Sequence, residues 1–306
     1  MTVDGTSRRH NRPKGQKESA MIYAQTARFD TGRALTEDEL RKVAPSVFAT
    51  TAHESRSTRF APIPTIEVVR GLAREGFEVV GAKQSVTRVA GKADFTKHLL
   101  RIRKMDSDAS YAVGDTVAEM LLKNANDGTA AYDLFAGLFR IACLNSMVAQ
   151  IGKIDSVKVR HSGDVMSKVI DGTFTVVENA KLALAAPAQW SQVKLDRDES
   201  LAMAEAARAI RFGDAEGNVD SPITATQLLT ARRREDSERN NLWTNFNVLQ
   251  ENVIRGGLHG VAVNANNVRR NMTTRAINGI DQDVKLNRAL WTLATRMAEL
   301  KGVAAI

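Results

Sequence analysis

The hydrophobic period of this chain changes near its middle, and that change limits the folds open to it. Over 77–89 and 95–104, apolar and polar residues alternate, which is typical of β-strands. Beyond Asp164 the apolar residues recur at the spacing of amphipathic helices instead. The sequence therefore predicts an α+β fold, with an N-terminal antiparallel β-sheet and packed helices followed by a mainly helical C-terminal half.

Local signals predict individual elements. Thr36 and Glu39 have the spacing of a capping box, so a short helix is expected to begin there and to end before Pro45. Thr65 is suited to cap a second helix, which Gly76 ends. The other predicted elements are strands over 77–89 (with a bulge), 95–104, 117–123 and 157–161, a turn at 126–128, and helices over 129–144, 164–183, 196–211, 222–234, 237–255 and 281–301.

Three regions follow from this pattern. Residues 1–30 are predicted to be a disordered basic arm, because 1–17 carry five basic side chains against Asp4 and show no hydrophobic period. This arm is either a solvated tail or a phosphate-binding extension. The remaining regions are an α+β core domain at 31–163 and a helical region at 164–306 with a long basic loop at 256–283.

Composition excludes several classes of protein. With 43% hydrophobic and 25% charged residues among 306, the chain is expected to form a packed core, not a disordered or fibrous protein. The single cysteine, Cys143, cannot form an intrachain disulfide. No apolar run approaches the roughly 20 residues of a membrane span. We therefore expect a cytoplasmic protein.

The familiar catalytic motifs are absent from the sequence. There is no GK[ST] phosphate-binding loop, no HExxH zinc motif, no CxxC pair and no GxSxG nucleophile elbow. Asp281 and Asp283 fit the negative charge favoured at a helix N-terminus. We therefore expect no enzymatic activity, no cofactor and no metal site. The histidines stand singly and are interpreted as structural or surface residues: His53, His98, His161 and His259.

Basic side chains are the chemistry that remains. Alternation places Lys97, Arg101 and Arg103 on one strand face, beside Lys83 and Arg88 of the preceding strand. A second group lies in the predicted loop and the helix after it: Arg255, Arg269, Arg270, Arg275, Lys285 and Arg288. Guanidinium groups offer a planar fork suited to phosphate, and nearby asparagines add neutral hydrogen bonds. We expect the two groups to meet in one cationic track, with a solvated charged surface as the alternative.

Aromatic residues are sparse, at 5%. Trp243, Phe246 and Trp291 occur on amphipathic helices and are predicted to lie in the core. Phe95 and Tyr111 flank the basic strand and are the candidates for exposed rings. Because base stacking on aromatic side chains supplies much of the affinity in single-strand binding proteins, any nucleic-acid contact here is expected to be mainly electrostatic and strongly salt-dependent.

Four stretches resemble a known family. They are PTIEVVRGLAREGFEVVGA at 64–82, FTKHLLRIRK at 95–104, NANDGTAAYDLFAGLFRIACLNSMV at 124–148 and TRAINGIDQDVKLNRALWTLATRMAELK at 274–301. They look like the phage- and plasmid-borne proteins of the domain of unknown function 932 family, and the likeness runs from about Thr31 to Leu300. The family often has Ser-His-Asp-Gly at the turn that ends in Gly128, and Cys-Ser-Asn-Gly where this chain has Cys-Leu-Asn-Ser from Cys143. The missing histidine argues against a catalytic role for the turn.

A weaker, architectural similarity is to single-strand annealing proteins, in which a helix packs on a curved antiparallel sheet and copies assemble into rings or filaments. The order of the predicted helix at 65–75 and the strands at 77–89 and 95–104 matches that arrangement. We therefore expect a non-enzymatic nucleic-acid-binding protein, with single-stranded DNA binding or annealing favoured and a homo-oligomer possible. The alternative is a protein-interaction or assembly component of a mobile element, such as an anti-defence factor that binds host or phage proteins.

Overall fold

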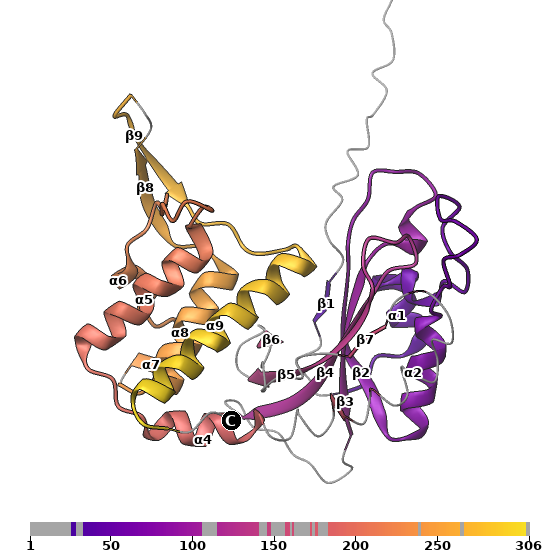
Figure 1. Cartoon of the computed structure of the whole chain (residues 1–306), viewed down its shortest axis with the longest axis horizontal. Coiled ribbons are helices and arrows are strands. Elements are labelled where there is room, and N and C mark those ends of the chain that lie inside the picture. Colours follow the sequence, from indigo (N-terminus) through magenta and orange to yellow (C-terminus); the bar gives the residue numbers. More distant parts are fainter. Residues whose placement is uncertain are drawn as a thin grey trace, which may run out of the picture.

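The computed structural model describes residues 26–28, 33–105, 115–140, 146–147, 157–159, 161, 172, 175–176, 183–237, 240–263 and 266–303. Most of the predicted basic arm, Tyr111, Cys143 and most of the predicted helix at 164–183 lie outside these residues. The described part confirms the α+β class: a sheet with packed helices forms one half and helices form most of the other (Figure 1).

The sheet is antiparallel throughout and has seven strands among the described residues. Its order is β1-β2-β3-β4-β5-β6, and β7 also pairs with β5. A register shift between Val79 and Gly81 confirms the bulge expected in the first long strand. The strands are β1 (Thr26–Arg28), β2 (Phe77–Gln84), β3 (His98–Lys104), β4 (Thr116–Asn124), β5 (Tyr132–Arg140), β6 (Ser146–Met147) and β7 (Val157–Val159).

Helices α1 (Glu37–Val43) and α2 (Thr65–Arg74) and the 3-10 turn η1 (Pro45–Phe48) pack on one face of this sheet. The capping box at the start of α1 is present: Thr36 N–H donates to Glu39 Oε2 (2.9 Å), and Glu39 N–H donates to Thr36 Oγ1 (3.3 Å). Thr65 is the first residue of α2 and does not cap it. Its hydroxyl instead contacts Nε2 of the buried His98 in β3, at 3.0 Å.

The predicted helix at 129–144 is wrong, because Tyr132–Arg140 is the central strand β5. All nine residues of β5 are buried, since helices cover both faces of the sheet along its length. A strand buried on both faces is a continuous apolar run without alternation, and such a run is hard to distinguish from a buried helix by period alone. The predicted strand at 77–89 also ends earlier, at Gln84.

The C-terminal helices surround a second core. Trp190, Phe246 and Trp291 are buried there, and the partly buried Trp243 packs against them. The core prediction is therefore confirmed for Phe246 and Trp291, and Trp243 lies at the edge of the same core. The predicted helix at 222–234 is wrong, because that stretch holds one four-residue helix, and a second one starts only at its last residue. The helices are α4 (Ala185–Gln192), α5 (Arg197–Phe212), α6 (Ala225–Leu228), α7 (Arg234–Ser237), α8 (Leu242–Arg255) and α9 (Ile280–Leu300).

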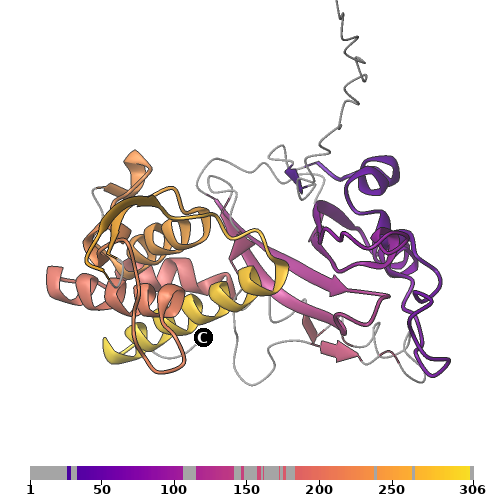
Figure 2. The same ribbon diagram turned by 90° about the horizontal axis from the view of Figure 1, so that it is seen from above.

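The predicted loop at 256–283 contains a β-hairpin, β8 (His259–Val263) paired with β9 (Arg269–Thr273), which projects from the helical half (Figure 1). Every residue of β9 is exposed, so no buried face imposes an apolar alternation on the sequence. Figure 2 shows β4 and β5 running from the α1 and α2 side towards the helices. In the described residues, no helix is both long enough and apolar enough to cross a bilayer.

Candidate nucleic-acid interface

The predicted strand-face cations lie on the sheet face opposite α1 and α2. Strand register sets one row across this face, in which Lys83 of β2 lies beside Leu99 of β3, and Leu99 beside Lys123 of β4. The next row along β3 contains Arg101 beside Leu121. The alternation in the sequence therefore places these cations on the same face of the sheet as the structure does.

Two of these cations share one carboxylate inside the sheet. Arg101 binds Glu119 of β4 through Nε and Nη2, at 2.6 and 2.9 Å from its two carboxylate oxygens. Arg103 binds the same carboxylate, with Nη2 2.6 Å from Oε1. Burial raises the pKa of Glu119, but the charges and hydrogen bonds of Arg101 and Arg103 outweigh this and hold the pKa below its usual value. Neither arginine is available to hold an external phosphate.

The lysines of the same face bind the first turn of α9. Lys97 forms an ion pair with Asp281, and Lys123 lies 3.4 Å from the same side chain. Lys83 lies 3.6 Å from Asp283. The acids that the sequence assigned to the helix N-terminus are indeed in its first turn, where they also neutralise the sheet. The cationic track predicted across the strand face is therefore covered.

Apolar contacts seat the same helix turn on the sheet. Ile280 and Val284 are buried in a small cluster with Leu99, Leu121 and Phe135. Further along α9, the Arg288 guanidinium carbon lies 4.7 Å from the Phe135 ring centroid, so this predicted phosphate ligand packs against the sheet.

The other predicted site residues do not join the strand face. Arg255 ends α8 and binds the buried Glu251 at 2.5 Å, so it too has a carboxylate partner. Arg269, Arg270 and Arg275 are exposed on the hairpin and at its root, and Lys285 is exposed on α9. These four form no ion pair among the described residues. Three of the exposed, unpaired cations among the predicted site residues, Arg269, Arg270 and Arg275, are therefore on or at the root of the hairpin.

The hairpin is firmly rooted. Gly256 has φ of 61°, and a Cβ there would lie 2.6 Å from the carbonyl carbon of Arg275. Thr274 N–H donates to the Leu258 carbonyl at 2.9 Å, which closes the root of the hairpin. Further out, the Val261 N–H donates to the Pro222 carbonyl at 2.9 Å. The two glycines that follow Arg255, the last residue of α8, thus allow two backbone segments to pass close to each other.

The register of the hairpin separates its two arginines. Arg269 pairs with Val263 and Arg270 with Ala262, and successive residues on a strand point to opposite faces. Apolar side chains are exposed on the same hairpin, with Val261 at 46%, Val268 at 58% and Met272 at 43% of their full accessibility. A groove of about 530 Å³ runs beside it, lined by Gln227, His259, Gly260, Val261, Asn271, Met272 and Thr273.

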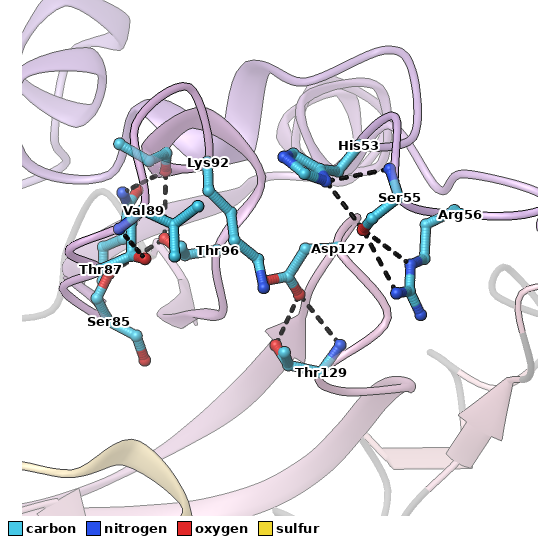
Figure 3. Close-up of polar contacts among 12 residues, drawn as sticks. His53, Ser55, Arg56, Ser85, Thr87, Val89, Lys92, Thr96, Asp127 and Thr129 are labelled. Atoms are coloured by element: carbon cyan, nitrogen blue, oxygen red, sulfur yellow. Dashed lines mark hydrogen bonds and ion pairs between the residues drawn. The ribbon is translucent and has the colours of Figure 1, made fainter.

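Arg88 lies in a different place, in the connection between β2 and β3 at one end of the sheet, where it is exposed. This connection and the 126–129 turn form a polar cluster (Figure 3). Thr129 donates to Asp127 from its N–H and its hydroxyl, at 2.9 and 2.6 Å, and Lys92 lies 3.2 Å from that carboxylate. Burial raises the pKa of Asp127, but these contacts outweigh it and leave the pKa below its usual value.

The turn is also packed by Arg56, whose side chain lies over Gly128 so closely that a Cβ there would meet its Nη1 at 2.6 Å. Arg56 donates to Ser55 Oγ at 3.2 Å, and Ser55 Oγ lies 2.9 Å from His53 Nδ1. Arg88 belongs to the same connection, and among the described residues the cluster forms no hydrogen bond or ion pair with the β8–β9 hairpin. We interpret it as the packing of the turn.

The histidines are structural where the structure describes their contacts. His98 is buried between Ser46 Oγ (2.8 Å from Nδ1) and Thr65 Oγ1 (3.0 Å from Nε2), and burial lowers its pKa to about 3. His161 stacks on Phe60 with ring centroids 4.4 Å apart. In the described part of the chain, no three His, Cys, Asp or Glu side chains are grouped so as to hold a metal ion.

Sequence reasoning missed Glu119 as the partner of both arginines. The signal was present in the alternation of β4, which puts Glu119 on the same face as Lys123 and therefore on the face that Arg101 and Arg103 of the neighbouring strand share. It also missed the hairpin, because β9 has no apolar alternation and β8 is a strand of only five residues.

The sequence similarity to known proteins extends over most of the chain. The UPF0380 protein YafZ of Escherichia coli (strain K12) is 42% identical over 262 residues, covering 86% of this chain and 91% of that protein. The UPF0380 protein YfjQ of the same organism is 41% identical over 262 residues, with the same coverage. No solved structure matches the chain, so the similarity to single-strand annealing proteins stays a prediction, as does the phage and plasmid association. The family described as Domain of unknown function (DUF932) matches residues 52–291, and the chain belongs to that family.

Proposed function

We propose that this protein binds the phosphate backbone of nucleic acid through the β8–β9 hairpin, without enzymatic activity. One observation carries this proposal. Arg269 and Arg270 are exposed on a projecting ribbon and have no ion pair among the described residues, whereas Arg101 and Arg103 of the sheet are bound to Glu119. Guanidinium groups without a carboxylate partner bind phosphate without first breaking an ion pair.

The shape of the hairpin supports the same proposal. A two-stranded ribbon fits the major groove of duplex DNA, which is about 12 Å wide. Because Arg269 and Arg270 point to opposite faces, the ribbon presents a guanidinium on each of its two sides. Arg275 at the root and Asn271 on β9 add hydrogen-bond donors along the same path.

Stacking contributes little to this binding mode. Among the described residues, no aromatic side chain is a large exposed hydrophobic group, and Phe95 is half-buried beside His53, with ring centroids 5.4 Å apart. The expected binding is therefore electrostatic, independent of base sequence and steeply dependent on salt. Single strands are bound no more tightly than duplexes in this proposal, since a preference for single strands usually requires aromatic platforms.

The test is a salt titration of binding to single- and double-stranded oligonucleotides with the Arg269→Glu/Arg270→Glu variant. Its affinity is expected to fall at least tenfold at low salt, and the slope of log K against log salt to become shallower by about 2, at roughly 0.9 per phosphate contact. Arg59→Glu/Arg74→Glu is the matched control, since both arginines are exposed and the change in net charge is the same. Equal losses in the two variants would show that only net charge matters and would refute the proposal.

A second candidate function is docking of a protein partner. The exposed Val261, Val268 and Met272 favour it, because exposed apolar side chains gathered on one projecting element are typical of protein contacts. This candidate predicts that the wild-type protein binds oligonucleotides no better than the Arg59→Glu/Arg74→Glu control does, at any salt concentration. A solution mass above that of the monomer, which falls in a Val268→Asp/Met272→Asp variant, would favour it over nucleic-acid binding.

A further inference from the structure

We infer that the first turn of α9 masks a second phosphate-binding surface, formed by Lys83, Lys97 and Lys123 and here named the lysine face. The inference deepens the proposed function and rests on it, since it concerns how the same nucleic-acid backbone is held. The ligand class is a phosphodiester backbone, for which the carboxylates of Asp281 and Asp283 stand in while the helix turn is docked.

The lysine face gathers like charges that need an anion. Its three ammonium groups come from three neighbouring segments of the sheet, and their side chains are only 13–16% exposed. Asp133 of β5 is a further acid of the sheet in this group, 3.7 Å from Lys123. One sheet carboxylate does not balance three lysines, so Asp281 and Asp283 supply the missing negative charge from outside the sheet.

Only a short part of α9 takes part in this contact. Ile280 and Val284 belong to the small cluster on the sheet, whereas Leu286, Leu290 and Trp291 belong to the core of the helical half. The N-cap Gly279 provides no side-chain cap for the helix that begins at Ile280. The first turn can therefore unwind while the rest of α9 stays packed, at the cost of its ion pairs and of the buried Ile280 and Val284, which new phosphate contacts to the lysines must offset.

The segment before the helix leads directly to the hairpin. Ile277 N–H donates to the Ile254 carbonyl at 2.8 Å and holds the chain to α8, so only 278–285 need move. Because few residues separate the hairpin root from the first turn of α9, a nucleic-acid backbone bound at the root lies close to that turn. Phosphates that compete for the lysines replace the two carboxylates with groups of the same charge, and the number of phosphate contacts rises.

The test uses Asp281→Asn/Asp283→Asn, which removes the two charges and keeps the side-chain shape. We expect tighter binding of a duplex oligonucleotide at low salt, with the slope of log K against log salt steeper by about 2 to 3. The matched control is Asp38→Asn/Asp198→Asn, which removes exposed acids from the first turns of α1 and α5. Adding Lys83→Gln, Lys97→Gln and Lys123→Gln to the first variant should abolish the gain.

Hydrogen exchange of the wild-type protein is the second measurement, and it does not depend on any variant folding. Addition of the duplex should speed exchange at 283–287, whose amides donate to the carbonyls of 279–283, and leave 290–300 protected. Unchanged exchange there, or a gain in affinity equal to that of the control, overturns the inference. If Arg269→Glu/Arg270→Glu abolishes binding while the aspartate variant gains nothing, the proposed function stands and the masked surface falls. A gain from the aspartate variant with no effect of the hairpin variant would support the masked surface and refute binding through the hairpin.

Discussion

At the residue scale, Glu119 determines what the basic strand face can do. Its carboxylate is buried in β4 and accepts hydrogen bonds from two arginines of β3. Two guanidiniums in a largely dry environment would be strongly destabilising without it, because a buried unpaired charge costs several kcal/mol. The phenyl ring of Phe139, 3.2 Å from the Arg101 guanidinium carbon, adds a cation–π contact to the same arrangement.

We predict that Glu119→Gln lowers the free energy of unfolding by about 3–5 kcal/mol at neutral pH, as measured by urea denaturation. The folded-state pKa of Glu119 lies below the unfolded value, so its stabilisation is present above the unfolded pKa and is lost as pH falls through the folded pKa. The variant should lack that acid-side loss. The control is Glu37→Gln, which removes an exposed carboxylate from its pair with Arg70 and should change stability far less. Equal effects of the two substitutions would contradict the buried pairing.

At the scale of the element, the hairpin depends on its glycine root. The left-handed φ of Gly256 lets the chain turn from α8 into β8 while passing against Arg275. Arg232 Nε donates to Asn252 Oδ1 at 2.5 Å and its Nη2 contacts the Gly256 carbonyl, so a side chain from outside the hairpin braces the same turn. The hairpin is therefore a constructed arm and not a free loop.

We predict that Gly256→Ala costs roughly 1–3 kcal/mol of stability, because alanine at positive φ is strained and its Cβ would meet backbone atoms. Faster hydrogen exchange in β8 and β9 should accompany the loss. Gly71→Ala serves as the control: that glycine lies in α2 with nothing within 4 Å of the added Cβ, and alanine should stabilise the helix by roughly 0.5–1 kcal/mol. A silent Gly256→Ala variant would show that the root is loose.

At the scale of the whole molecule, the sheet and the helices share one strand. Leu134 and Ala136 of β5 lie in the core beneath α1 and α2, while Leu138 lies in the core of the helical half. At the end of the same strand, Arg140 binds both carboxylate oxygens of Asp236 in α7 at 3.0 Å, and both side chains are buried. The two halves are therefore expected to unfold together.

We predict that Asp236→Asn destabilises the protein by about 3–5 kcal/mol, because Arg140 stays buried without its counter-charge. The three tryptophans all lie in the helical half, so their emission reports on that half alone, while circular dichroism reports on both. Wild-type unfolding curves from the two probes should coincide, and those of the variant should separate. Coincident curves in the variant would mean that the pair does not couple the halves.

The local features of this protein could be predicted from its sequence. Short sequence patterns indicate the capping box of α1, the ends of α5 and α9 and the burial of Phe246 and Trp291, because each of these features depends on residues a few positions apart. The strand β5 could not be distinguished from a helix, since both of its faces are covered and its apolar run carries no period.

The sequence by itself determined the fold class and the number and sign of the charges, because composition and period are properties of the chain alone. Only the tertiary structure decided which charges stay accessible. Arg103 meets Glu119 sixteen positions away, and Lys97 meets Asp281 at a separation of 184. A side chain's partner across such distances is set by strand register and helix packing, which bring residues together whatever their separation in the chain.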